Sequence, residues 1–302
     1  MQSFSRRDYL AAAAVVLIWG LNFVAMKFAL RDFTPFQLGA ARYVFAALPL
    51  ALWLRPPHLP ARWVLLYGLF QGVGQFGFLF CALKVGMTAA LASVLMQTQV
   101  LFTAVLGFVL LRERASRALI WGLGLACLGL SCFVVHVMQT STAGSGASTV
   151  TGWGLLLNIC AAAMWAASNI VARKAQQSGR QFDALAFVVW SSLVPIVPFV
   201  LMALLWDDPA TRSQWHSAPL SSWLAVAYLG WIATAVAYGL WTGLLRHHAA
   251  NRVAPLSLGV PLVGLSAGMW VLGERLSTWQ WGGMALILAA LAVVLGSGLR
   301  RA

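Results

Sequence analysis

Several carboxamide side chains lie inside long apolar stretches of this sequence. Asn22 and Asn169 each precede a lysine by five residues, so the pattern Asn-x-x-x-x-Lys occurs twice. A carboxamide can donate a hydrogen bond to a carboxylate and accept one from an ammonium group, as a zwitterion requires. Polar groups at membrane depth tend to line a cavity or a path. The two asparagines are therefore candidates for binding a small zwitterion, and a hydrogen bond between packed helices is the alternative.

Three glutamines extend this candidate site. Gln71 and Gln75 are four residues apart and therefore share one face of a helix. Gln97 and Gln99 are two residues apart, which is about 200° around a helix, so we expect only one of them to face a cavity. Gln97 is the preferred candidate. Hydrogen bonds that hold helices together are again the alternative.

Aromatic rings and one arginine complete the candidate residues. Trp19, Trp165, Tyr238 and Trp241 lie within apolar segments, where they could form the walls of a cavity, although packing alone would also explain them. Arg42 lies about six residues into an apolar segment. It could attract a substrate carboxylate. The simpler explanation is that Arg42 snorkels to the membrane surface or bonds to a broken helix end.

No pattern in the sequence is typical of catalysis or of a bound metal or cofactor. The segment Gly264–Gly268 fits the G-x-S-x-G motif of a hydrolase, but that chemistry needs a strand–turn–helix context with acid and histidine partners. The same segment fits G-x-x-x-G, which favours close helix packing. A membrane-embedded hydrolase is a remote alternative that would need Ser266 and His136 around a water-filled pocket. The sequence therefore predicts no enzyme, no metal and no cofactor.

The composition places this chain in a membrane. Hydrophobic residues make up 61% of the 302 residues and charged residues 9%, and the mean hydropathy is +0.82. Soluble domains carry about 25% charged residues. The net charge of +13 could suggest nucleic acid, but the charges lie at the ends of apolar segments and form no long run. We therefore expect contact with membrane lipid and no nucleic-acid partner.

Ten apolar stretches are each about long enough to cross a bilayer. Because backbone groups in lipid must be hydrogen-bonded within the segment, each stretch is expected to be helical. The sequence thus predicts an all-α integral membrane protein with ten transmembrane helices. These segments span approximately residues 9–30, 36–54, 63–83, 87–111, 117–138, 152–172, 183–205, 222–245, 253–272 and 279–299.

The two halves of the chain repeat each other. Besides the asparagine motif, Leu110–Ser116 and Val271–Ser277 share a Glu-Arg pair at the end of an apolar segment. We predict a first five-helix repeat in residues 1–140, a polar linker in 141–150 and a second five-helix repeat in 151–302. An odd number of crossings makes the second copy enter from the opposite side, which gives the inverted repeat common in secondary transporters. Two complete repeats make a functional monomer feasible, and a homodimer is the alternative.

The distribution of lysine and arginine predicts the orientation. If the N-terminus is cytoplasmic, fourteen of the 20 basic residues fall on the cytoplasmic side and five on the other, with Arg42 inside a segment. The positive-inside rule therefore favours a cytoplasmic location for both termini.

Five stretches along nearly the whole chain resemble a known family. They are Trp-Gly-Leu-Asn-Phe-Val (19–24), Gln-Phe-Gly-Phe-Leu-Phe-Cys-Ala (75–82), Gly-Met-x-Ala-x-Leu-Ala-Ser-Val-Leu-x-Gln (86–97), Val-Val-Trp-Ser-Ser-Leu-Val-Pro-Ile-Val-Pro-Phe (188–199) and Arg-Val-Ala-Pro-Leu-Ser-Leu-x-Val-Pro-Leu-Val-Gly-Leu (252–265). On these residues the chain resembles the EamA-type branch of the drug/metabolite transporter superfamily, and within it the exporters of cysteine and O-acetylserine. Gln97 is preferred over Gln99 because it belongs to one of these stretches.

The resemblance implies export of small amino-acid metabolites from the cytoplasm across the bacterial inner membrane. Related exporters of threonine, homoserine or aromatic amino acids share the scaffold, so these substrates, or lipophilic drugs, are the alternatives. The resemblance also implies that the fifth and tenth helices pair at the periphery. We expect alternating access around a central cavity.

The seven carboxylates all lie at segment ends or in loops. A proton-coupled exporter usually needs a titratable group within the membrane. We therefore expect an uncharged cavity and export down the metabolite gradient, or only weak proton coupling. Glu113 and Glu274 are expected to pair with neighbouring arginines or helix ends.

Overall fold

The structure, a computed structural model, describes residues 5–111, 117–142, 150–178, 182–248, 253, 256–257 and 259–299. All regular elements in these residues are helices, and none is a strand. Seven helical runs are long and apolar enough to cross a membrane, and Gly259–Leu272 and Thr278–Val294 are shorter apolar helices. The chain is therefore a multi-pass membrane protein, and the count of ten crossings stays a prediction.

Helices occur in all ten predicted segments, and several segments are divided. The first half contains α1 (Arg6–Ala29), α2 (Pro35–Ala51), α3 (Ala61–Tyr67), η1 (Gly68–Phe76), α4 (Gly77–Lys84), α5 (Ala89–Leu95), η2 (Met96–Thr98), α6 (Gln99–Leu111) and α7 (Arg117–Thr142). The second half contains α8 (Gly152–Gln177), α9 (Ala184–Ser191), α10 (Ile196–Trp206), α11 (Pro209–Arg212), η3 (Gln214–Ser217), α12 (Leu220–Ala227), η4 (Tyr228–Val236), α13 (Ala237–His247), α15 (Gly259–Leu272) and α16 (Thr278–Leu299). Residues 112–116, which include Glu113, lie outside the described residues. The same is true of residues 143–149 of the predicted linker.

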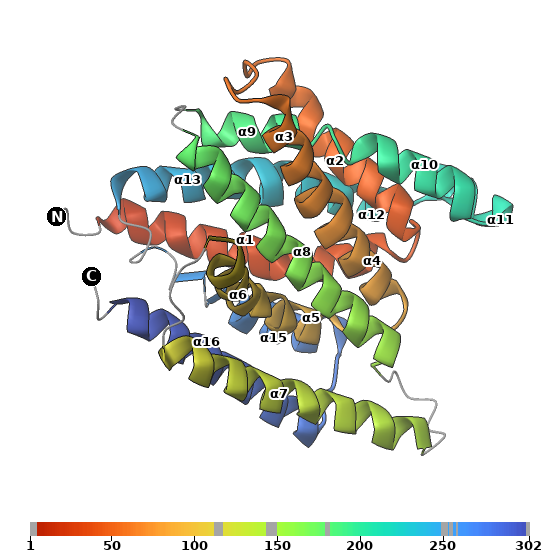
Figure 1. The fold of residues 1–302 in the computed structure, drawn as a ribbon. Coiled ribbons are helices and arrows are strands. Elements are labelled where there is room, and N and C mark those ends of the chain that lie inside the picture. The colour runs from red at the N-terminus through yellow and green to blue at the C-terminus, as the bar shows by residue number, and fades with distance from the viewer. Residues whose placement is uncertain are drawn as a thin grey trace.

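Helix α1 lies within the bundle and contacts both halves of the chain (Figure 1). Its start is fixed by a capping box, in which the Ser5 amide donates to the Asp8 carboxylate at 2.8 Å and the Asp8 amide donates to Ser5 Oγ at 3.2 Å. The helix packs along α15 and also contacts α5, α12, η4 and α13. Side chains on different faces of α1 can therefore reach elements of either half.

Two of the spans change from α-helix to π-helix at comparable places. The π-helix η1 lies between α3 and α4, and η4 lies between α12 and α13; each is nine residues long. A π-helix bonds residue i to i+5 and is frequent at functional sites. In η4, Thr234 Oγ1 donates a hydrogen bond to the backbone carbonyl oxygen of Leu229 at 2.9 Å, which gives this carbonyl a side-chain partner within the π-helix.

Helices α7 and α16 pack along each other at one edge of the bundle (Figure 1). Gly129 and Gly283 permit the close approach, because a Cβ atom at either would lie 2.8 Å from the carbonyl oxygen of the other. This pairing agrees with the peripheral position that the family resemblance implies for the fifth and tenth helices.

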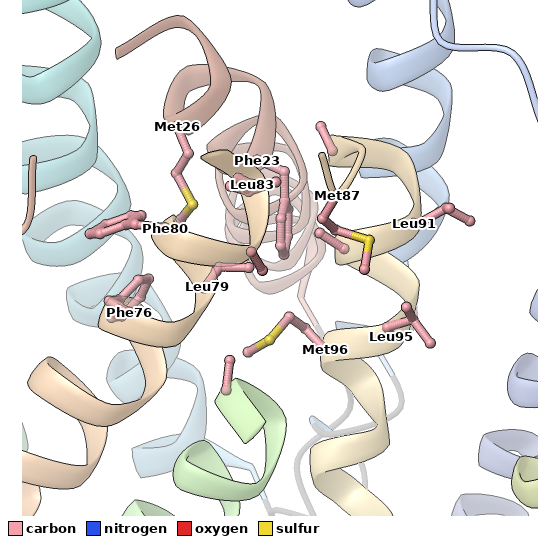
Figure 2. Packing of buried hydrophobic residues seen from close by; sticks show 14 of the residues in the cluster. Phe23, Met26, Phe76, Leu79, Phe80, Leu83, Met87, Leu91, Leu95 and Met96 are labelled. Carbon is pink, nitrogen blue, oxygen red and sulfur yellow. The ribbon is translucent and has the colours of Figure 1, made fainter. Parts of the chain in front are cut away.

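The largest apolar core joins α1, α4 and α5. Figure 2 shows Phe23 of α1, Leu79 of α4 and Met96 of η2 among the side chains of this cluster. Other large apolar side chains cover the outside of the bundle: Trp53 is 86% exposed and Trp270 is 84% exposed. Such a surface suits a protein whose solvent is lipid.

Two lysines join helix ends at the end of the bundle that lies opposite Arg6. Lys27 Nζ donates to the carbonyl oxygen of Leu83 at 2.8 Å, and Lys84 Nζ donates to that of Leu30 at 2.7 Å. Each lysine thus satisfies a carbonyl at the C-terminal end of the other's helix, where a cation is also favoured by the helix dipole. The first and third spans are thereby held together at this end.

Two carboxylates make further contacts between the halves at the same end. Thr34 Oγ1 donates to the Asp207 carboxylate at 2.6 Å, and the Ser222 hydroxyl donates to the Asp32 carboxylate. Burial raises the pKa of Asp207 above its ordinary value of 3.8, and the hydrogen bond from Thr34 opposes that rise. These contacts close this end of the bundle around the apolar core.

Candidate functional site

A cavity of about 280 Å³, here called the central chamber, lies among spans from both halves of the chain. This volume is close to the lower limit of typical ligand pockets, about 300–1,000 Å³, so the chamber suits a small metabolite. Its lining includes nine of the ten residues proposed from the sequence, which are Trp19, Asn22, Arg42, Gln75, Gln97, Trp165, Asn169, Tyr238 and Trp241.

A smaller cavity of about 20 Å³, here called the side chamber, adjoins the central chamber. It has room for about one water molecule. The two chambers share the side chains of Arg42, Tyr67, Phe76 and Tyr238. Gln71, the tenth proposed residue, lines the side chamber and is not among the residues of the central one.

The two asparagines reach the central chamber from α1 and α8. Asn22 is buried, and its Oδ1 has no hydrogen-bond partner. Asn169 Nδ2 donates to Gln99 Oε1 at 2.8 Å and to Thr103 Oγ1 at 3.3 Å. A buried acceptor without a donor is costly, so Asn22 is suited to accept a hydrogen bond from a bound molecule.

Gln97 and Gln99 both line the central chamber, so the expectation that only one of them would face a cavity is wrong. The reason is the 3₁₀ turn Met96–Thr98, which advances about 120° per residue and brings the two directions closer than an α-helix does. Gln97 Nε2 donates to the carbonyl oxygen of Ser257 at 3.3 Å. Gln99 Oε1 accepts the hydrogen bond from Asn169 Nδ2 that is described above.

Gln71 and Gln75 lie on the π-helix η1 but meet different neighbours. Gln71 Oε1 accepts a hydrogen bond from Ser168 Oγ at 2.5 Å, and its Nε2 donates to the Tyr238 hydroxyl at 3.3 Å. Gln75 Oε1 is buried without a partner beside the central chamber. Gln71 is therefore part of a fixed network, whereas Gln75 has an acceptor to offer.

Three aromatic rings form one connected wall of the central chamber. Trp19 lies edge-on to Tyr238 with ring centroids 5.3 Å apart, and its centroid is 5.4 Å from that of Trp241. Trp19 Nε1 donates to the carbonyl oxygen of Ala233 at 3.0 Å. This bond ties α1 to the π-helix η4 and fixes the indole ring.

Arg42 is 3% exposed and lines both chambers, so the simpler explanation, anchoring at the membrane surface or at a helix end, is wrong. Its guanidinium carbon lies 3.7 Å from the centroid of the Phe76 ring. Nη2 lies 3.5 Å from Thr234 Oγ1, while Nε and Nη1 have no hydrogen-bond partner. The inward face of α2 thus carries a buried cation that the packing holds between the chambers.

The expectation of an uncharged cavity is also wrong, because Arg42 gives the chamber wall a positive charge. No carboxylate is among the described residues that line either chamber. Glu274 instead accepts the backbone amide hydrogens of Ala89 and Ala90 at 2.7 and 2.8 Å, so its partner is a helix end. Within the described residues, no group of three or more His, Cys, Asp or Glu side chains could hold a metal ion.

The segment Gly264–Gly268 lies inside α15 and packs against its neighbours. A Cβ atom at Gly264 would lie 2.5 Å from Ser93 Cβ on α5. Ser266 and His136 do not line either chamber, and His136 Nδ1 lies 3.1 Å from Ser277 Oγ. The motif therefore serves close helix packing and is not placed as a hydrolase nucleophile.

Sequence reasoning missed three polar residues that line the central chamber, which are Tyr67, Ser93 and Ser257. Tyr67 and Ser93 each precede a glutamine already singled out by four residues, so helical spacing from Gln71 and Gln97 was a signal that could have found them. Ser257 had no such signal. It enters the site because its backbone carbonyl faces Gln97 from a distant part of the chain.

The model of the EamA-like transporter family matches residues 7–135 and 152–296. A probable amino-acid metabolite efflux pump of Salmonella typhimurium is 39% identical over 300 residues, which cover 98% of either chain. A protein with the same description from Escherichia coli is 37% identical over 302 residues, covering 99% of this chain and 98% of the relative.

A solved crystal structure has the same fold. It aligns with a TM-score of 0.61 at 20% sequence identity and covers 98% of this chain and 99% of the other. The family match extends over most of the sequence, and both halves of the chain contribute to it. The chain therefore belongs to the EamA-like transporter family.

Proposed function

We propose that this protein exports small amino acids of the cysteine and O-acetylserine type from the bacterial cytoplasm across the inner membrane. Two relatives described as probable amino-acid metabolite efflux pumps support export of this class of molecule. The observation that carries the narrower proposal is the central chamber, which is small and is lined by the amides of Asn22, Gln75 and Gln97 together with Arg42. These groups can meet both the carboxylate and the amino group of a zwitterion.

Two inverted repeats, 1–140 and 151–302, would supply the moving parts. In support, the order α-helix, π-helix, α-helix occurs in both Ala61–Lys84 and Leu220–His247. The central chamber is lined by spans of both halves, as expected when a binding site lies at a repeat interface. Rocking of one half against the other would expose the substrate to each side in turn.

Both termini would lie in the cytoplasm, on the side with more lysine and arginine. The start of α1 and the end of α16 lie on the same side of the bundle, as this orientation requires (Figure 1). Each chain has its own central chamber, so a monomer would suffice for transport.

Efflux of labelled substrates from proteoliposomes tests this proposal. Cysteine and O-acetylserine should leave faster than threonine and phenylalanine. Gln97→Leu should slow the efflux of both preferred substrates, because it removes a carboxamide from the chamber wall. Gln176→Leu, which changes an exposed glutamine near the end of α8, is the matched control and should leave efflux unchanged. Preferred efflux of phenylalanine, or equal efflux from both variants, would contradict the proposal.

A further inference from the structure

No described side chain that lines the two chambers balances the charge of Arg42. The residue is 3% exposed, and Nε and Nη1 of its guanidinium have no hydrogen-bond partner. Its polar contact is the Thr234 hydroxyl, at 3.5 Å from Nη2. A buried guanidinium without an anion is strongly disfavoured unless an anion binds to it. The chamber wall therefore offers a positive charge and hydrogen-bond donors to a ligand.

Among the described residues, the chamber walls hold no carboxylate that could bind a positively charged part of a ligand. Neither Asp nor Glu occurs in the described part of the two chamber linings. What they offer to a nitrogen atom is the uncharged Oδ1 of Asn22 and Oε1 of Gln75, which are both without a partner. A neutral amide nitrogen can donate to such oxygens as well as an ammonium group can. The two ends of a zwitterion thus meet very different environments in this site.

We propose that Arg42 recognises the substrate carboxylate, and that the transported class is defined by this carboxylate and a hydrogen-bonding nitrogen that need not be charged. N-acylated amino acids would then be ligands alongside free amino acids, whereas amines without a carboxylate would not. This inference rests on the proposed function for its substrate series, but the binding test below does not require transport.

The surroundings of Arg42 support a fixed binding group. The guanidinium carbon lies 3.7 Å from the centroid of the Phe76 ring, and Tyr238 lines the same two chambers as Arg42. The Tyr238 hydroxyl is in turn held by Gln71 at 3.3 Å. A carboxylate in the central chamber can therefore meet the guanidinium without first moving a competing acid aside.

The test is calorimetric titration of the full-length protein in detergent with L-cysteine, N-acetyl-L-cysteine and cysteamine. N-acetyl-L-cysteine keeps the carboxylate and lacks the ammonium charge, and cysteamine has the reverse pattern. We expect the Kd of N-acetyl-L-cysteine to lie within about 10-fold of that of cysteine and cysteamine to bind about 100-fold more weakly or not at all. Binding of cysteamine as tightly as N-acetyl-L-cysteine would overturn the inference.

Variants assign the effect to Arg42. Arg42→Gln should weaken binding of both acids by about 10-fold to 100-fold, and Arg42→Lys should restore part of that loss because it returns the charge. Arg31→Gln removes an exposed arginine, which stacks on Phe28, and should leave both Kd values unchanged. If the Arg42 variants do not fold, the Kd values of the three ligands for the wild-type protein still test the inference.

The failure of this inference can be distinguished from the failure of the proposed function. If cysteine is exported but N-acetyl-L-cysteine does not bind, this inference alone fails. If N-acetyl-L-cysteine binds but neither cysteine nor O-acetylserine is exported, the proposed function alone fails.

Discussion

The side-chain carboxylate of Glu274 accepts the backbone amide hydrogen of Ala89 at 2.7 Å. Its other oxygen accepts that of Ala90 at 2.8 Å, so one side chain from the turn after α15 satisfies two amides at the N-terminus of α5. The first amides of a helix have no partner within the helix, and a negative charge is favoured there. This contact joins the two halves of the chain at one end of the bundle.

Glu274→Ala should therefore lower the free energy of unfolding by about 1–3 kcal/mol, because it leaves two amides without an acceptor. Unfolding of the purified protein in detergent measures this change. Asp208→Ala is the matched control, since the Asp208 side chain makes no capping bond to α11, and it should change stability by less than about 0.5 kcal/mol. Equal effects of the two substitutions would show that the cap contributes nothing.

Close packing of α15 against α5 gives a second prediction. A Cβ atom at Gly264 would lie 2.5 Å from Ser93 Cβ. Because Ser93 Cβ is bonded directly to the backbone of α5, it cannot move away as the end of a long side chain could. Gly264→Ala should destabilise the protein by about 1–3 kcal/mol through overpacking. Gly282→Ala, on α16, meets no atom within 4 Å and should be neutral or slightly stabilising. Melting temperatures of the two variants provide the comparison, and an unchanged value for Gly264→Ala would contradict the packing argument.

Asn22 and Asn158 form a matched pair for testing the chamber. Both are buried and both have a carboxamide oxygen without a partner, but only Asn22 lines the central chamber. Asn22→Ala should raise the KM of export by about 10-fold, as expected for the loss of one hydrogen bond to substrate, while Asn158→Ala should leave KM unchanged. Initial rates of efflux over a range of internal substrate concentrations measure both. A shift of KM in the Asn158 variant alone would remove Asn22 from the site.

The raised pKa of Asp207 predicts that the stability of the protein depends on pH. Burial raises its pKa above 3.8 in the folded protein, so between 3.8 and the raised value the folded protein binds more protons than the unfolded protein. Its contribution to stability therefore falls as the pH rises through this interval. Asp207→Asn keeps an acceptor for Thr34 and removes the charge, so the Tm of this variant should be at least that of the wild type near neutral pH. Melting curves recorded from about pH 4 to about pH 7 test this, with Asp208→Asn as the control; a lower Tm of Asp207→Asn at neutral pH is the contrary result.

In the part of the chain that the structure describes, no carboxylate lines either chamber, and this predicts how transport is driven. Proton-coupled exporters usually use a titratable group at membrane depth. An imposed pH gradient should therefore change the initial rate of cysteine efflux from proteoliposomes by less than about 2-fold. The same vesicles with the gradient dissipated by an ionophore are the control. Strong acceleration of uphill export by the gradient would show that proton coupling exists.

Much of the architecture follows from local sequence. Long apolar stretches must become helices in lipid, because each backbone group has to find its partner nearby. The candidate site could also be narrowed from the sequence, because polar side chains are rare at membrane depth and tend to line a cavity. Nine of the ten residues proposed from the sequence line one chamber. Their role in binding stays a prediction.

The details that decide the chemistry arise only from contacts between distant segments. Hydropathy does not distinguish a π-helix or a 3₁₀ turn from an α-helix. The sequence pattern therefore does not reveal the π-helices Gly68–Phe76 and Tyr228–Val236 or the 3₁₀ turn Met96–Thr98. Arg42 looked like a surface anchor, since a sequence cannot show that α2 turns this side chain toward Phe76. Hydropathy is a property of each segment alone, whereas the charge, shape and free hydrogen-bonding groups of a cavity depend on which segments face one another.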